Sequence, residues 1–243
     1  MKKLILIFLL GYSSTAQAQF KKPYFNTLDV KSGLPEANVA TSLEDKNGYL
    51  WMGTQNGLVR YDGYRFKPYP IRNGKGNIVA PVSVRNLLQD GKGKIWAYTR
   101  ENGINYYDAQ ADKFVQVPFD QKTMDAISTQ SLSSRVDDVS NNTQWLLLIN
   151  FITQKRTVYK FNTNNNTLQE YAATSTGKQH LPVKIPARII KDANGKVWLA
   201  GDSLLSFFDV KNQQFTPYFT LPQNLKGNKI VQLTPDPNDT NLL

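Results

Sequence analysis

The sequence predicts an all-β fold built from repeated four-stranded units, and three observations support this prediction. The chain has four tryptophans at intervals of 45, 49 and 53 residues: Trp51, Trp96, Trp145 and Trp198. Three of them follow an aspartate and a glycine at fixed distances, the glycines being Gly48, Gly93 and Gly195. Shortly after these same tryptophans, an aromatic residue followed by an aspartate recurs. A period in the forties with several short strands per unit is typical of a β-propeller blade.

The first repeat shows how the residues predict one blade. Its short apolar or alternating runs are typical of strands, and turn residues separate them. Asp45 can bond nearby backbone amides, and Gly48 can take the positive φ that such a turn requires. Asn56 followed by Gly57 is a strong signal for a tight hairpin with a primed turn. The expected strands are Asn38–Glu44, Tyr49–Thr54, Leu58–Tyr61 and Tyr64–Lys67.

Four such repeats account for most of the chain. The expected blades cover about residues 38–70, 83–119, 134–173 and 187–221. The third repeat is degenerate, because Val139 and Asn142 stand where the others have aspartate and glycine, although asparagine still tolerates a left-handed conformation. Residues 229–243 match the first strand and turn of a fifth unit. We therefore expect an incomplete β-propeller of about four four-stranded antiparallel blades plus the first strand of a fifth, truncated within a repeat.

The N-terminus predicts export. Lys2 and Lys3 precede a wholly apolar run, and Ala16-Gln17-Ala18 forms a small-residue cleavage pattern. These features are typical of a secretory signal peptide at residues 1–18, cleaved after Ala18. The expected mature region, residues 19–243, is then exported to the periplasm. A membrane anchor is disfavoured because the apolar run is far shorter than the ~20 residues that a membrane span needs.

Composition excludes several kinds of site. The chain has no cysteine, so disulfides, thiolate metal sites and cysteine nucleophiles are absent from it. Its formal net charge of +10 is spread along the sequence without long runs of one sign. Such a surface is compatible with anionic ligands or simply with solubility, and we expect no nucleic-acid partner in this region. No cofactor and no metal site are expected, since no calcium-loop pattern is present.

The first repeat closely resembles a known family. Ser32-Gly-Leu-Pro35, followed by the segment from Leu43 to Gly63, is similar to the two-component regulator propeller repeat. This resemblance implies the exported sensor region of a hybrid two-component protein, which binds a small molecule or an oligosaccharide. It also implies that membrane contact, kinase chemistry, phosphorelay and a possible homodimer belong to the longer parent protein. The resemblance is good in the second and fourth repeats and poor in the third.

The tryptophans and turn residues are interpreted as structural. A large aromatic side chain on the second strand of a blade is expected to pack between neighbouring blades, and stacking on a sugar is the alternative. The candidate ligand contacts are three arginines near the starts of the inner strands: Arg85, Arg135 and Arg188. Guanidinium groups converging on a central channel could bind a carboxylate or sugar hydroxyls. The alternative is that they pair with local acids such as Asp137 or Asp138.

An enzyme of the same fold is the rival hypothesis. A streptogramin-lyase-like propeller has a similar turn before its tryptophan, but its chemistry uses histidines and a metal. His180 is the single histidine of the chain and lies in a polar connection, so it supplies no base with an orienting partner. We therefore expect no catalytic residue in this region. Catalytic residues beyond it, or a stand-alone scaffold propeller, remain the alternatives.

Overall fold

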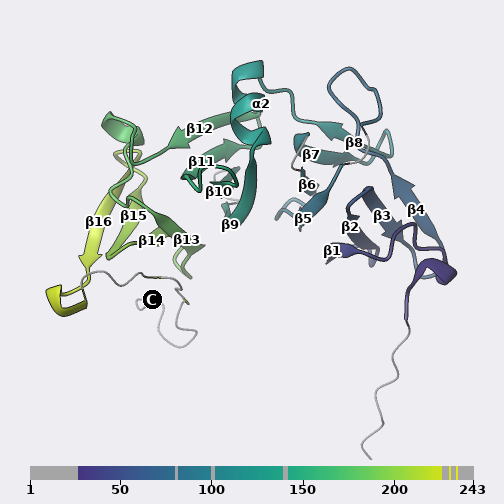
Figure 1. Cartoon of the computed structure of the whole chain (residues 1–243), viewed down its shortest axis with the longest axis horizontal. Helices are drawn as coiled ribbons and strands as arrows, with labels where there is room; N and C mark the ends of the chain where they lie inside the picture. The colour runs from purple at the N-terminus through teal and green to yellow at the C-terminus, as the bar shows by residue number, and fades with distance from the viewer. Residues whose placement is uncertain are drawn as a thin grey trace, which may run out of the picture.

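Four antiparallel sheets of four strands each stand side by side in an arc (Figure 1). This computed structural model describes residues 27–79, 82–99, 102–138, 142–225, 230 and 234. The predicted signal peptide therefore lies outside the described residues, and only Ile230 and Thr234 of the expected stub at 229–243 lie within them. The sheets confirm the predicted all-β fold, an incomplete β-propeller.

Within each sheet the strands follow one another in sequence order. The first strand lies toward the concave side of the arc and the fourth toward the convex side (Figure 1). The first two sheets contain β1 (Val39–Glu44), β2 (Leu50–Thr54), β3 (Gly57–Tyr61), β4 (Phe66–Tyr69), β5 (Val84–Gln89), β6 (Ile95–Thr99), β7 (Gly103–Asp108) and β8 (Lys113–Gln116). The last two contain β9 (Gln130–Asp138), β10 (Thr143–Asn150), β11 (Arg156–Asn162), β12 (Thr167–Tyr171), β13 (Pro186–Lys191), β14 (Val197–Gly201), β15 (Leu204–Asp209) and β16 (Gln214–Thr220).

The turn before Trp51, Trp96 and Trp198 is a hydrogen-bonded unit in which one aspartate accepts several hydrogen bonds. In the first blade, Asp45 Oδ1 accepts bonds from the amides of Asn47 and Tyr49 at 2.8 and 3.1 Å. Asp45 Oδ2 accepts the indole N–H of Trp51 at 2.7 Å. The same indole bond joins Trp96 to Asp90 at 2.8 Å and Trp198 to Asp192 at 2.7 Å. The aspartate thus fixes both the turn and the side chain that follows it.

Backbone geometry explains the glycines of this turn. Gly48, Gly93 and Gly195 have φ values of 80°, 83° and 83°, in the region that favours glycine. Asn142 of the degenerate third repeat takes φ 49°, as its left-handed tolerance predicts. The structure corrects one detail of the first hairpin, where Gly57 has φ 111° but Asn56 is not at positive φ. The two-residue primed turn expected there is absent because β3 already begins at Gly57, paired with Thr54.

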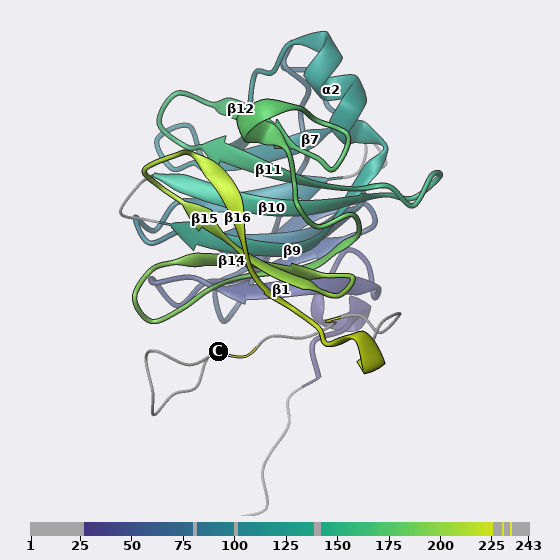
Figure 2. The same ribbon diagram turned by 90° about the vertical axis from the view of Figure 1, so that its left-hand side faces the viewer.

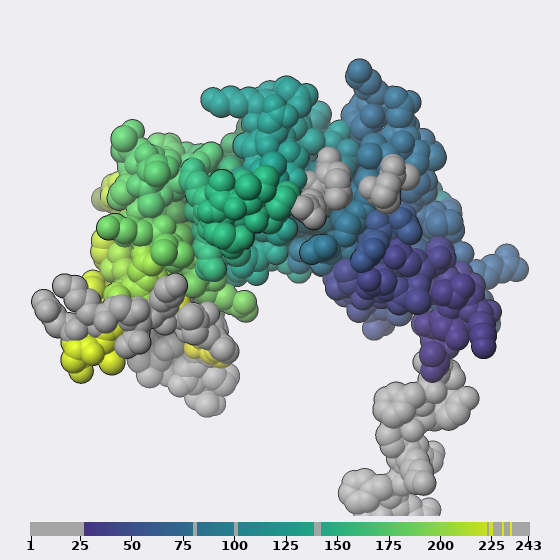
Figure 3. Space-filling model, viewed as in Figure 1, coloured from purple at the N-terminus to yellow at the C-terminus, as the bar shows by residue number. Residues whose placement is uncertain are grey.

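The tryptophans fill the spaces between neighbouring sheets. Trp51, Trp96 and Trp145 are at most 1% exposed, and each belongs to an apolar cluster that includes residues of the following blade. Trp198 packs with Phe207 and with Ile230, beyond the fourth sheet. Figure 2, which faces the fourth sheet, shows β14–β16 lying in front of β10 and β11. The core is therefore a series of sheet-to-sheet layers, and the space-filling view shows the arc open on its concave side (Figure 3).

One helix interrupts the repeat between the second and third sheets. The sequence analysis assigned no element here, but the structure has α2 at Gln121–Ser128, with Asp120 as its N-cap accepting from the Thr123 amide at 2.7 Å. The third sheet begins directly afterwards at Gln130. Gly103, at φ 65°, lets the helix approach, since an added Cβ would lie 3.1 Å from Ile127 Cδ1. Within the described residues, no helix has the length and apolarity required to span a membrane.

Replacing the turn aspartate of the first blade is expected to destabilise the chain. Asp45→Ala leaves the buried indole N–H of Trp51 without its acceptor, so the free energy of unfolding should fall by about 1–3 kcal/mol. Urea denaturation followed by far-ultraviolet circular dichroism measures this change. Asp62→Ala is the control, because Asp62 also accepts two backbone amides but lies in an exposed turn. An equal loss in both variants would contradict a special role for the indole bond.

Candidate functional site

The first and third sheet-to-sheet interfaces contain matching aromatic quartets. In the first, Trp51 packs against three rings at centroid distances of 4.9–5.6 Å: Tyr69, Tyr107 and Phe114. In the third, Trp145 packs against three rings at 4.5–5.7 Å: Tyr171, Phe208 and Phe215. The strand register places the members of the two quartets at equivalent positions of their blades. Ring packing of this kind stabilises both interfaces beyond the area that it buries.

The middle interface lacks two of these rings. Trp96 packs edge-on against Phe161 at 5.4 Å, but Leu168 pairs with Phe161 where the other interfaces have Phe114 and Phe215. Val117, whose amide bonds to the carbonyl of Ile104, takes the place of the quartet tyrosine. A cavity of about 260 Å³ lies at this interface, lined in part by Leu168.

We call this space the α2 cavity, because helix α2 forms one of its walls. Its apolar walls come from both sheets and from the helix: Tyr98, Ile104, Ile127, Leu132, Leu146, Leu148 and Leu168. Its polar lining comes mainly from the starts of the inner strands β5 and β9: Arg85, Asn86, Gln130 and Ser131. Thr99 and Gly103 complete it. A mostly apolar cavity with a few polar groups has the character of a small-molecule site.

One polar atom of the cavity lining has an unmet bond. Gln130 Nε2 donates to the carbonyl of Ala126 at 2.7 Å and to the hydroxyl of Tyr159 at 3.2 Å. Gln130 Oε1 is buried and has no hydrogen-bond partner in the structure. A buried acceptor without a donor carries a desolvation cost, which a ligand relieves once a shift of the Gln130 side chain brings this oxygen to the cavity surface.

The tyrosine of the cavity wall is held in its neutral form. The hydroxyl of Tyr98 donates to Gln144 Oε1 across the interface at 2.5 Å. Burial raises the pKa of Tyr98 well above its usual value, because the ionised phenol would lose its hydration. Tyr98 therefore contributes packing and a fixed contact between the second and third blades.

The structure does not bring the three predicted arginines to one equivalent position. Arg85 lies at a bulge of β5 and lines the α2 cavity, with its Nε 3.4 Å from Ser83 Oγ. Arg135 pairs with Leu146, which packs toward the second blade. Arg188 pairs with Ala200, which packs with Trp198 on the face of the fourth sheet that points away from the third blade. All three are exposed, and a shared three-arginine site has no support from this register.

The acids considered as partners for these arginines contact a lysine. Lys191 Nζ donates to the backbone carbonyl of Asp137 at 2.8 Å and lies 3.9 Å from Asp138 Oδ1. Burial raises the pKa of the Asp137 carboxyl, and the charge of Arg135 partly opposes that rise. This lysine therefore links the third and fourth blades at their inner strands.

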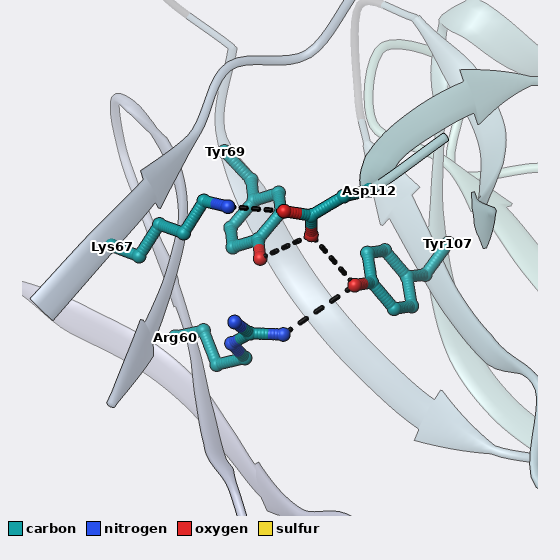
Figure 4. Close-up of polar contacts among 5 residues, drawn as sticks. All are labelled: Arg60, Lys67, Tyr69, Tyr107 and Asp112. Atoms are coloured by element: carbon teal, nitrogen blue, oxygen red, sulfur yellow. Dashed lines mark hydrogen bonds and ion pairs between the residues drawn. The ribbon is translucent and has the colours of Figure 1, made fainter. Parts of the chain in front are cut away.

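A second polar cluster joins the first two blades (Figure 4). The Asp112 carboxylate accepts from Lys67 and from the hydroxyls of Tyr69 and Tyr107 at 2.6 and 2.7 Å. Arg60 donates to the Tyr107 hydroxyl at 3.4 Å. The bonds from Lys67 and Tyr69 hold the pKa of Asp112 well below its usual range. This cluster has the features of a structural tie. Sequence reasoning missed it because Lys67 and Tyr69 lie more than forty residues before Asp112.

Each tryptophan also lies beside a cation. Lys94 Nζ is 4.7 Å from the ring centre of Trp96, and Lys196 Nζ is 4.7 Å from that of Trp198. Arg60 and Lys160 take this role for Trp51 and Trp145 at 5.5 and 5.6 Å. The recurring lysine two residues before Trp96 and Trp198 was the available sequence signal for these contacts. Trp51, Trp96 and Trp145 are at most 1% exposed, so these three rings offer no face on which a sugar can stack.

No other constellation in the described part of the chain suggests chemistry. Among the described residues, no group of three or more His, Asp or Glu side chains could hold a metal ion. His180 is exposed, and its Nδ1 lies 3.1 Å from the carbonyl oxygen of Ser175. That contact orients the ring toward the backbone and provides no base for a nucleophile.

Comparison with known proteins supports the resemblance seen in the sequence. Residues 33–56 match the family model described as the two component regulator propeller, so this segment is confirmed as a repeat of that family. The fold is similar to the extracellular domain of a putative hybrid two component system from B. thetaiotaomicron, with a TM-score of 0.51 and 19% identity over 77% of this chain and 22% of that one. No curated protein matches the chain.

Two further solved structures share the fold. The extracellular domain of a putative one component system from B. thetaiotaomicron gives a TM-score of 0.54 and 16% identity, over 86% of this chain and 25% of that one. PorZ, a surface component of the type-IX secretion system of Porphyromonas gingivalis, gives a TM-score of 0.50 and 16% identity, over 76% and 28%. At these identities the likeness shows the fold, and the chain spans about a quarter of the length of each.

The Asp112 cluster is expected to make stability depend on acid pH. The folded pKa of Asp112 lies below its unfolded value of about 3.9, so its contribution is full above that value and is lost as pH falls through the folded pKa. The loss of unfolding free energy in Asp112→Asn should therefore be larger at pH 7 than at pH 3, by urea denaturation. Lys67→Met should show part of the same difference. A deficit equal at both pH values would contradict this assignment.

Proposed function

We propose that this chain belongs to the ligand-sensing region of an exported two-component signalling protein and that it responds to carbohydrate. The observation that carries the proposal is the match of residues 33–56 to the two component regulator propeller. The similar fold of the extracellular domain of the B. thetaiotaomicron system supports it. The described residues contribute binding surfaces between packed blades, and the proposal assigns them no chemistry of their own.

The arrangement of the blades suggests how such a sensor would work. Neighbouring blades meet through layers of side chains and through a few polar ties, such as Asp112 with Lys67 and Tyr69. A ligand that contacts two blades at once would favour one relative placement of them over another. In the proposed parent protein, that shift would pass to a membrane segment further along the chain.

A binding screen tests the sensing role. The mature chain is expected to bind at least one oligosaccharide of a panel of plant and host glycan fragments, with a saturable rise in melting temperature that follows ligand concentration. Isothermal titration calorimetry then gives the affinity and stoichiometry. The constituent monosaccharides serve as controls. A complete panel without any saturable binding would argue against carbohydrate sensing by this region.

Export to the periplasm is the second part of the proposal. The signal peptide predicted at residues 1–18 should be removed, so periplasmic material should begin at Gln19 when its N-terminus is sequenced. Ala16→Leu together with Ala18→Leu should block cleavage, because the peptidase requires small side chains at these positions. Asn26→Ala, beyond the predicted cleavage site, is the control. Recovery of the full-length chain from the cytoplasm would contradict export.

A further inference from the structure

We propose that the α2 cavity is a binding site for a hydroxyaryl carboxylate, a small molecule with an aromatic ring, a phenolic hydroxyl and a carboxylate. The inference is independent of carbohydrate sensing and goes beyond it. It depends on three observations at the second interface: the missing rings, the unpaired acceptor of Gln130 and the position of Arg85.

The missing rings define the apolar part of the ligand. Both neighbouring interfaces place a phenylalanine where Leu168 lies, and those rings pack on their tryptophans at 5.4–5.6 Å. The α2 cavity, at about 260 Å³, exceeds the roughly 150 Å³ of an apolar cavity that accepts benzene. A ligand ring in this space would pack against apolar wall residues of both blades, among them Tyr98 and Leu168.

The unpaired acceptor defines the hydroxyl. Gln130 Oε1 is buried and lacks a donor, while the amide nitrogen of the same side chain is already bound to Ala126 and Tyr159. These two bonds fix which end of the amide is available, so the free atom is an acceptor. A phenolic O–H donates to such an oxygen, whereas an unsubstituted ring would leave it unpaired.

The charge at the cavity defines the carboxylate. Arg85 lines the α2 cavity from an exposed position on β5, so its guanidinium lies where the cavity meets solvent. The ion pairs found among the described residues are formed by Lys67 and by Lys191, and Arg85 takes part in neither of them. A guanidinium presents paired donors that match a carboxylate, which can stay partly hydrated at this position.

The probe is 4-hydroxyphenylacetate, titrated into the mature chain by calorimetry and by methyl NMR. Saturable binding is expected, with shifts at the methyl groups of Ile104, Ile127 and Leu148. Phenylacetate lacks the hydroxyl and should bind about 3- to 10-fold more weakly. 4-Hydroxyphenylethanol lacks the carboxylate and should bind at least tenfold more weakly. No saturable binding of the probe, or equal binding of all three compounds, would overturn the proposal.

Two pairs of variants place the site in the cavity. Leu168→Phe adds the ring found at the other interfaces and should abolish probe binding while the melting temperature stays equal or rises; Leu168→Met, of similar volume to leucine, should keep binding. Arg85→Gln should weaken binding at least tenfold, whereas Arg188→Gln, an exposed arginine of the fourth blade, should leave it unchanged. Wild-type affinity in Leu168→Phe would show that the probe binds elsewhere and would overturn the proposal.

Discussion

The fold depends on a buried indole whose N–H is satisfied by the turn that precedes it. A tryptophan placed between two sheets supplies a large apolar surface, but its N–H would lose a water bond without a protein acceptor. Asp45, Asp90 and Asp192 provide that acceptor from a turn whose amides they also bind. In the third blade Val139 replaces the aspartate, and Trp145 is held by the aromatic quartet and by Lys160. The turn, the strand and the interface are thereby one cooperative unit.

Because these units repeat, differences between interfaces are informative. The first and third interfaces share an aromatic quartet, and each has a cation from the third strand, Arg60 or Lys160, near its tryptophan. The second interface has Leu168 and Val117 instead, together with helix α2. At this interface Phe119 packs edge-on against Phe161 at 5.9 Å, and Ile127 of the helix belongs to the same cluster as Trp96. The interface that departs from the pattern holds the α2 cavity, and a cavity of about 570 Å³ lies at the third interface, lined in part by Trp145 and Phe208.

Local features were predictable from the sequence, while features that depend on contacts between blades were not. The turns, the sheet count and the burial of the tryptophans follow from fixed spacing within one repeat, and Asn142 took the left-handed conformation expected of it. Counting back from the tryptophans did not give equivalent arginine positions. Val136 and its strand partner Trp145 are joined by a connection that is one residue longer than the connection between Ile190 and its partner Trp198. A shift of one residue reverses the face of a strand. Arg85 falls at a bulge, which spacing alone does not reveal.

Helix α2 and the cavity beside it also depend on contacts between blades, so the sequence did not predict them. Asp120 gives the helix a local start signal, but the eight-residue length is too short for a periodic pattern to stand out. Its stability comes from packing, since Ile127 and Met124 lie beside Gly103, where an added Cβ would be 3.1 Å from Ile127 Cδ1 and 3.4 Å from Met124 Cε. The glycine, the helix and Leu168 lie far apart in sequence and act together only at one interface. A site formed in this way couples two blades directly, so any molecule bound there would stabilise their relative placement, which is the property that a sensor built from stacked sheets requires.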